Sequence, residues 1–383
     1  MKKVFACLLA VCMVLPAMAG CSRPQETTAV RLSEVTHSVF YAPQYVAISQ
    51  GFFADEGLTV ELSNGGGADK VMTAVVSGQA DIGLAGPEAS IYVAQQGKED
   101  PPVIFAQLTR RDGSFLVGRS DGPFRWENLR GSTIIGGRAG GVPEMTLEYV
   151  LRQHGLTPGE DVTVDTSVQF NMMAGAFTGG GGDYVTLFEP TATEVEQAGK
   201  GYILCSIGQE SGEIPYTAYF ANRSYLTANA GTVQRFTNAI ARAQRWVAEH
   251  TDREVAEAIC GQFPDTDLAV LERVCARHRE IDAWNLTPVM EQAALERLGV
   301  QCLFPREQFQ MFCPVTAEKQ AALAAATTCS WVASGQPNLM LFSTVSWNRY
   351  TVWNTMEMFL SKLSQVNSRT SCPPTETEPA FTS

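Results

Sequence analysis

Aromatic and polar side chains directly follow the first strand that the sequence predicts. Residues 30–35 alternate like a strand, and His37, Ser38, Phe40 and Tyr41 come next. Aromatic rings at the end of a strand can stack on a flat ligand. The alternative is that Phe40 and Tyr41 only pack against the next helix. We take all four residues as candidate ligand-binding residues.

Two further candidate segments are glycine-containing helix starts. Gly86, Pro87 and Glu88 follow a predicted strand over residues 81–85, and Pro is well tolerated at the start of a helix. A helix start offers free N–H groups and a partial positive charge to a ligand. The same reasoning applies to the segment before a helix that opens at residues 143–144, where glycines let a ligand approach the backbone. Its candidates are Gly140, Gly141 and Val142, although these glycines could serve only a turn.

Charged side chains near these segments constrain the ligand. Arg138 could pair with an anion or bridge to Glu144. Glu189 follows a predicted strand over residues 184–187, and with Glu88 it would give the site an acidic component. Two acids favour an amine, an aminopyrimidine or a cation over a sulfonate. The alternative for Glu189 is helix capping, because acidic residues are welcome in a first helical turn.

Enzyme motifs are weak in this chain. Residues 118–122 match G-x-S-x-G, but residues 123–126 (PFRW) form no clear helix after the serine, so we interpret the segment as a hinge. The glycine-rich stretches lack the Gly-Lys-Ser/Thr of a phosphate-binding loop. The four histidines and the absence of a CxxC pair predict no metal or redox site. We therefore expect a protein without a cofactor that is not an enzyme.

Composition excludes some partner classes. The chain has 383 residues, a mass of 41.5 kDa and a formal charge of −12. This length fits one large or two medium domains. An acidic balance argues against nucleic-acid binding, which normally draws on a basic patch.

The N-terminus predicts export. Lys2 and Lys3 precede an apolar run over residues 4–15, and the small residues before Cys21 resemble a bacterial lipobox. We expect a signal peptide over residues 1–20, lipidation of Cys21 and a polar tether over residues 21–29, which places the protein outside the cytoplasm on a membrane anchor. The alternative is a plain signal peptide that leaves Cys21 free.

Strands and helices alternate along the body of the chain. Strands are predicted over residues 30–35, 58–62, 81–85, 103–108 and 114–118, with helices between them, and the pattern restarts with strands over residues 133–135, 162–166, 184–187 and 202–206. After an extended piece over residues 216–221 the chain becomes helical, over residues 231–250, 252–261, 267–280 and 288–298. Two α/β units of this kind favour mostly parallel sheets covered by helices.

The two units and the added helices suggest an α/β two-lobed clamp in which the chain crosses between the lobes twice. We place the crossings near residues 119–123 and 213–216. Lobe one would be residues 30–118 plus 216–300, with a helical C-terminal part, and lobe two residues 119–215. A ligand would bind between the lobes, outside the carboxyl ends of the strands.

Several segments resemble one family of binding proteins. They are HSVFYAPQYVA at 37–47, GFF at 51–53, EGL at 56–58, SGQADIG at 77–83, GPEAS at 86–90, GGRAGGVPE at 136–144, DYVTLFEP at 183–190 and DAWN at 282–285. The family serves ABC importers for thiamine precursors, riboflavin, aliphatic sulfonates and nitrate, and the resemblance covers residues 30–300.

The resemblance implies the type II periplasmic-binding-protein fold. It also implies a monomer that captures a small molecule, closes by a hinge motion and docks on a membrane permease. We favour a pyrimidine-like or other aromatic heterocycle as ligand, because of Phe40, Tyr41 and the acids. The alternatives are a ligand-sensing receptor and an enzyme that makes the thiamine pyrimidine from its own histidine, for which His37 would be the candidate.

The C-terminal part does not fit this picture. Residues 301–383 contain no Asp, and three of the six Trp lie there. We predict that this tail is disordered or results from a reading-frame shift near residue 300.

Overall fold

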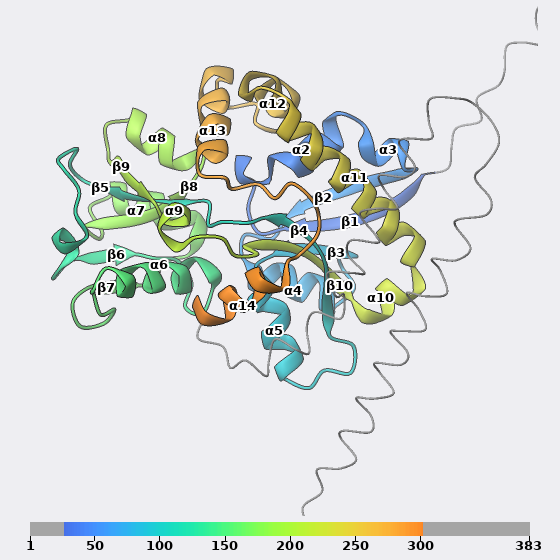
Figure 1. The fold of residues 1–383 in the computed structure, drawn as a ribbon, viewed down its shortest axis with the longest axis horizontal. Coiled ribbons are helices and arrows are strands. Elements are labelled where there is room, and N and C mark those ends of the chain that lie inside the picture. The colour runs from blue at the N-terminus through green and yellow to red at the C-terminus, as the bar shows by residue number, and fades with distance from the viewer. Residues whose placement is uncertain (1–26, 302–383) are drawn as a thin grey trace, which may run out of the picture. The chain divides into compact units, whose positions relative to one another are not determined.

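Ten strands form two mixed five-stranded sheets within residues 27–301, the part of the chain that this computed structural model describes. Figure 1 shows that helices flank both sheets. The predicted signal peptide, Cys21 and residues 302–383 lie outside the described residues. Among the helices within 27–301, none is long and apolar enough to cross a membrane.

The first sheet has the strand order β2-β1-β3-β10-β4. Its strands are β1 (Thr28–Glu34), β2 (Leu58–Asn64), β3 (Ile82–Ala85), β4 (Pro102–Thr109) and β10 (Thr217–Asn222). β1 runs parallel to β2 and β3, whereas β10 is antiparallel to both β3 and β4. The predicted tether through residue 29 is too long, because Thr28 and Ala29 already pair with Leu58 and Thr59 in this sheet.

The second sheet has the order β7-β6-β8-β5-β9. Its strands are β5 (Ser114–Gly118), β6 (Thr133–Ile135), β7 (Thr163–Asp165), β8 (Tyr184–Phe188) and β9 (Tyr202–Ser206). Here β5 is the antiparallel strand. In each sheet the antiparallel strand is thus the one that the chain enters directly after leaving the other sheet. The other four strands of each sheet run in one direction, so the sheets are mostly parallel, as predicted, with one antiparallel strand each.

The first crossing lies earlier than the sequence suggested. The chain leaves the first sheet at Thr109 and enters the second at Ser114, so the expected crossing near residues 119–123 is wrong and β5 does not belong with the first sheet. Gly118 pairs with the first residues of β8 and β9, which places the G-x-S-x-G segment at the far end of β5 rather than at a hinge. The serine is followed by a loop and then by a 3-10 helix over Trp126–Leu129, not directly by the α-helix that a nucleophile elbow would require. The return crossing runs between α9 (Ile207–Ser211) and β10.

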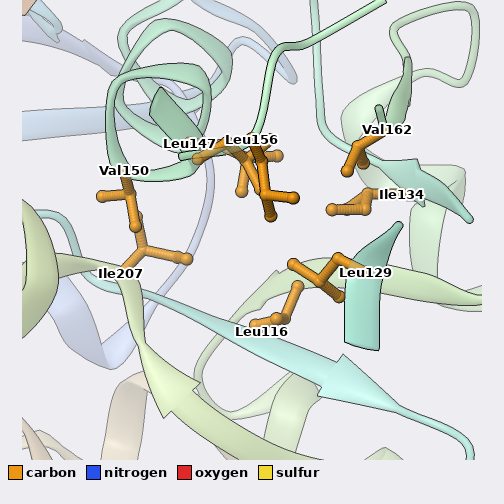
Figure 2. Close-up of a cluster of buried hydrophobic side chains, with 9 residues drawn as sticks. Leu116, Leu129, Ile134, Leu147, Val150, Leu156, Val162 and Ile207 are labelled. Atoms are coloured by element: carbon orange, nitrogen blue, oxygen red, sulfur yellow. The ribbon is translucent and has the colours of Figure 1, made fainter. Parts of the chain in front are cut away.

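Alternation along the strands of the second sheet builds two separate cores. Leu116 and Ile134 lie in one buried cluster, whereas their neighbours Val117 and Ile135 lie in another. Successive residues of a strand point to opposite faces, so each face receives its own helices. In Figure 2 the first cluster joins these strands to α6 (Val142–Gln153) and α9. The second cluster is covered by α7 (Met173–Thr178) and α8 (Thr191–Gln197).

Helices also cover both faces of the first sheet. Figure 1 shows α2 (Ala42–Ser49), α3 (Phe52–Asp55), α11 (Ala230–Glu249) and α12 (Asp252–Ile259) over one face, and α4 (Ala68–Val76) and α5 (Pro87–Gln95) over the other. The long helix α11 carries an apolar stripe, since Phe236, Ile240, Ala243 and Val247 are buried, whereas Val233 on the same face is half-buried. The remaining helices are α10 (Arg223–Ala228), α13 (Leu268–Glu280) and α14 (Gln292–Gln301), the last of which begins four residues later than predicted.

Candidate ligand-binding site between the two sheets

Segments that follow strands of one sheet contact segments that follow strands of the other. We call the part that carries the first sheet lobe one, the part that carries the second sheet lobe two, and the contact between them the interlobe junction. Ser38, after β1, caps a short 3-10 helix over Val39–Tyr41 by accepting a hydrogen bond from Phe40 N. Its hydroxyl also donates to the backbone oxygen of Glu189, after β8, over 2.5 Å. Ser38 therefore links the lobes.

Glu88 is a buried acid at the start of α5. One carboxylate oxygen, Oε1, lies 3.4 Å from the amide of Val142 and 3.8 Å from Arg138 of lobe two. The other oxygen, Oε2, has no hydrogen-bond partner among the described residues. Burial raises the pKa of this carboxyl to about 7, against the opposing effects of Arg138 and nearby amides. A Cβ on Gly86 would lie 2.0 Å from Oε2, so this position must be glycine for the carboxyl to fold back over it.

The predicted glycine segment of lobe two meets Glu88. Gly140 has a φ of +70°, a conformation that favours glycine, and its carbonyl oxygen accepts a hydrogen bond from Tyr92 of α5 over 3.0 Å. Gly141 precedes the first residue of α6, Val142, whose amide points at Glu88. The sequence-predicted residues Gly86, Pro87, Glu88, Gly140, Gly141 and Val142 are thus brought together by the fold.

Arg138 lies on the edge of this cluster. Its guanidinium is 3.8 Å from Glu88 and 3.9 Å from Asp69 of α4. The alternative bridge to Glu144 is not found among the described residues, and Glu144 accepts from the amide of Gly140 instead. The side chain of Arg138 is 44% exposed, so its pairing with these acids is screened by solvent.

Phe40 is 1% exposed and packs at the first crossing rather than standing free. Its ring centroid lies 5.6 Å from those of Tyr41, Phe188 and Tyr216. A Cβ on Gly113, in the crossing itself, would lie only 2.4 Å from the ring. The packing alternative therefore describes Phe40, although its partners are the crossing and lobe two rather than the next helix alone. Tyr41 is 3% exposed and lies beside this ring.

Glu189 is held by protein groups on both carboxylate oxygens. The amide and the hydroxyl of Thr193 each donate to it over 2.9 Å, and the Arg277 guanidinium of α13 forms an ion pair with it. Its side chain is fully buried. The capping alternative accounts for Glu189, and the ion pair adds a second link between the lobes. We therefore do not retain Glu189 as a ligand contact.

His37 is directed into lobe one. Its Nδ1 lies 2.8 Å from the buried Glu34 carboxylate, and its Nε2 lies 2.9 Å from the backbone oxygen of Gln262. Glu34 also accepts hydrogen bonds from Gln44 and Tyr45. Both ring nitrogens of His37 are thus engaged, which argues against ligand contact and against a role for this histidine in chemistry at the junction.

The comparisons with known proteins agree with this architecture. Residues 39–254, more than half of the chain, match a family model described as NMT1/THI5 like. The relative YtlA of Bacillus subtilis is 44% identical over 295 residues, which are 77% of this chain and 88% of the relative. The chain belongs to the NMT1/THI5-like family. The family resemblance predicted from sequence is therefore confirmed.

Solved structures share the fold of this NMT1/THI5-like chain. The alkanesulfonate-binding protein SsuA from Xanthomonas axonopodis pv. citri, bound to MOPS, superposes with a TM-score of 0.58 at 19% identity, covering 73% of this chain and 96% of that one. The periplasmic nitrate-binding protein NrtA from Synechocystis PCC 6803 gives a TM-score of 0.60 at 16% identity, covering 79% and 89%. The predicted α/β fold of periplasmic binding proteins is confirmed.

Sequence reasoning missed several groups of this NMT1/THI5-like site. Asp112 and Tyr216 lie in the two crossings and are both buried. His278 is also buried, and its ring stacks 5.6 Å from that of Phe40. Trp284, in the DAWN segment, donates to the backbone oxygen of Phe40 over 3.0 Å. An Asp-Gly pair between two strands signals only a turn, so no local pattern marked Asp112 as part of a site.

Proposed function

We propose that this protein is the extracytoplasmic substrate-binding component of an ABC importer, which captures a small molecule between its two lobes and delivers it to a membrane permease. The observation that carries the proposal is the meeting of two α/β lobes, joined by two crossings, through Glu88 and the start of α6. In open α/β sheets, ligands bind outside the carboxyl ends of the strands. Ligand contacts made only when the lobes are together would drive a hinge closure.

For the ligand we propose a pyrimidine-like or other aromatic heterocycle. The Tyr41 ring is buried beside Phe40 at the junction, and one Glu88 carboxylate oxygen has no hydrogen-bond partner among the described residues, so opening of the lobes would present both groups to a ligand. A buried acid is a poor partner for a sulfonate or for nitrate. The solutes in the names of the structural neighbours therefore do not transfer to this chain.

We infer the location of the protein in the cell from its N-terminal sequence. A lipid on Cys21 would hold the protein at the outer face of the cell membrane, within reach of the permease, and two acyl chains give a stable anchor. We expect the protein to act as a monomer and to require no cofactor.

Ligand-induced stabilisation tests the proposal directly. The full chain with Cys21→Ser, which cannot be lipidated, would be screened by thermal shift against thiamine-pyrimidine analogues, riboflavin, aliphatic sulfonates and nitrate. A ligand that binds only the folded protein raises the melting temperature, and the shift grows with the ratio of its concentration to its dissociation constant. We expect a heterocycle to give the largest shift. A chain that responds to no small molecule would contradict the capture function.

A further inference from the structure

The buried carboxyl of Glu88 lies where the first turns of two helices meet. Glu88 belongs to the first turn of α5 in lobe one, and its Oε1 accepts from the amide of Val142, the first residue of α6 in lobe two, over 3.4 Å. The amides of Glu88 itself and of Ala89 also act on the carboxyl and lower its pKa, although burial raises the pKa by more. One carboxylate therefore lies at the starts of two helices, one from each lobe.

The start of a helix is a favourable place for a negative charge. Its first N–H groups have no partner within the helix, and the helix dipole adds a partial positive charge there. Both helices are long enough for this effect, since α5 has nine residues and α6 has twelve. The Arg138 guanidinium, 3.8 Å from Oε1 of Glu88, adds a full positive charge. The groups around the carboxyl are thus those of an anion-binding site.

Neighbouring residues keep the Glu88 carboxyl in this place. The residue is 1% exposed, and its side chain folds back over Gly86, where a Cβ would lie 2.0 Å from Oε2. One turn later in α5, Tyr92 donates to the carbonyl oxygen of Gly140 across the junction and holds the loop before α6 against α5. Oε2 has no hydrogen-bond partner within residues 27–301, which is costly for a buried acid. The chain therefore accepts an energetic cost to place a carboxyl at these helix starts.

We infer that Glu88 is a specificity-determining residue whose carboxylate fills an anion-binding site, formed by the starts of α5 and α6 and by Arg138, and so excludes free oxyanions from it. The carboxylate occupies the space and repels a second anion at short range. Exclusion of an unwanted ligand by a built-in repulsive group is one of the two routes to specificity. The inference goes beyond the proposed capture function, because it concerns the ligand-free chain and holds whichever solute is captured.

Chemical rescue tests this assignment. Glu88→Ala removes Cγ, the carboxyl carbon and both oxygens, which are the same heavy atoms that acetate contains. The melting temperature of the full Cys21→Ser chain carrying Glu88→Ala would be followed at pH 8 against increasing sodium acetate, with sodium chloride at equal concentration as the reference. We expect acetate to raise the melting temperature saturably, by about 2–4 °C, because an anion that binds only the folded chain stabilises it. The Cys21→Ser chain that keeps Glu88 should not distinguish the two salts.

Further variants locate the bound anion and measure selectivity. By calorimetric titration, nitrate and methanesulfonate should bind Glu88→Ala at least about tenfold more tightly than the chain that keeps Glu88. Glu88→Gln fills the same space with a neutral amide and should respond to no anion. Glu99→Ala, which removes an exposed glutamate from a loop, is the matched control and should behave like the chain with Glu88. Glu88→Ser removes the same carboxyl and takes the place of Glu88→Ala if that variant does not fold.

Three results would overturn the assignment. An acetate response of Glu88→Ala no larger than that of Glu99→Ala would mean that the helix starts form no anion-binding site. An equal response in Glu88→Gln would place the bound anion elsewhere on the chain. Nitrate or methanesulfonate binding as tight in the chain with Glu88 as in Glu88→Ala would show that Glu88 excludes neither. None of these measurements uses the captured solute, so an unsuccessful ligand screen would count against the capture function alone.

Discussion

Replacement of Glu88 by glutamine should change how stability depends on pH. In the structure the Glu88 carboxyl is buried at the interlobe junction, one of its oxygens has no hydrogen-bond partner within residues 27–301, and its pKa rises from 4.5 to about 7. A glutamine has nearly the same shape and keeps an oxygen that can accept from the amide of Val142. It mimics the neutral acid at every pH, so the comparison isolates the cost of ionising this one buried group.

The sign and size follow from linkage. Because the pKa is raised in the folded chain, the stability that Glu88 contributes is fully present below pH 4.5 and is lost as the pH rises through about 7. Each pKa unit corresponds to about 1.4 kcal/mol, so the rise from 4.5 to about 7 corresponds to a loss of at most about 3.5 kcal/mol. Any opening of the lobes would hydrate the carboxylate and reduce this loss, so the figure is an upper bound. Glu88→Gln should therefore be more stable than the wild type at pH 8 by up to about 3.5 kcal/mol.

Urea denaturation of the ligand-free chain at pH 5 and pH 8 measures this difference. We expect the two proteins to be closer in stability at pH 5 than at pH 8. Glu99→Gln, which removes an exposed glutamate from a loop, should leave the wild-type pH dependence unchanged. The reasoning is refuted if Glu88→Gln is less stable than the wild type at pH 8, or if its stability changes between pH 5 and pH 8 as much as that of the wild type.

Three further predictions concern a core residue of lobe two, an ion pair between the lobes and a histidine of lobe one. Leu147→Ala should lower the free energy of unfolding by about 2–5 kcal/mol, because it empties a fully buried position in the core of lobe two. Arg277→Met should cost about 3 kcal/mol, measured by urea denaturation, because the buried carboxylate of Glu189 loses its charged partner and keeps only the Thr193 donors. Glu34 raises the pKa of His37 above 6.5, so protonated His37 stabilises the chain fully below pH 6.5 and this stabilisation is lost as the pH rises. His37→Gln should flatten that part of the pH–stability curve.

Matched variants make these comparisons specific. Leu286→Ala removes the same atoms from a leucine that is 52% exposed and should cost little. Arg125→Met replaces an exposed arginine and should be nearly neutral. Equal losses for Leu147→Ala and Leu286→Ala, or for the two arginine variants, would contradict the assigned packing and pairing. If His37→Gln has the same pH dependence of stability as the wild type, then the pairing of His37 with Glu34 is not the cause of that dependence.

Much of the secondary structure and part of the site could be predicted from local patterns. Alternation in residues 30–35 and the stripe on α11 follow from burial of one face, and that periodicity is a property of the sequence itself. Glycine before a helix start, as at Gly86 and Gly141, likewise indicates a backbone that a ligand or another part of the chain approaches closely. These local signals correctly placed the starts of α5 and α6, and the structure brings them together.

The sequence by itself determined most helices and strands, the two α/β units and the family. Periodic burial and special backbone conformations select residue types within a few positions, so a local pattern is enough to recognise them. Only the tertiary structure decided which sheet β5 joins, since a short apolar strand buried on both faces fits either sheet. It also decided that Glu189 pairs with Arg277 and that Asp112 lies near Tyr216. Those partners lie far apart along the chain, and no local pattern encodes which side chains meet once the two crossings are formed.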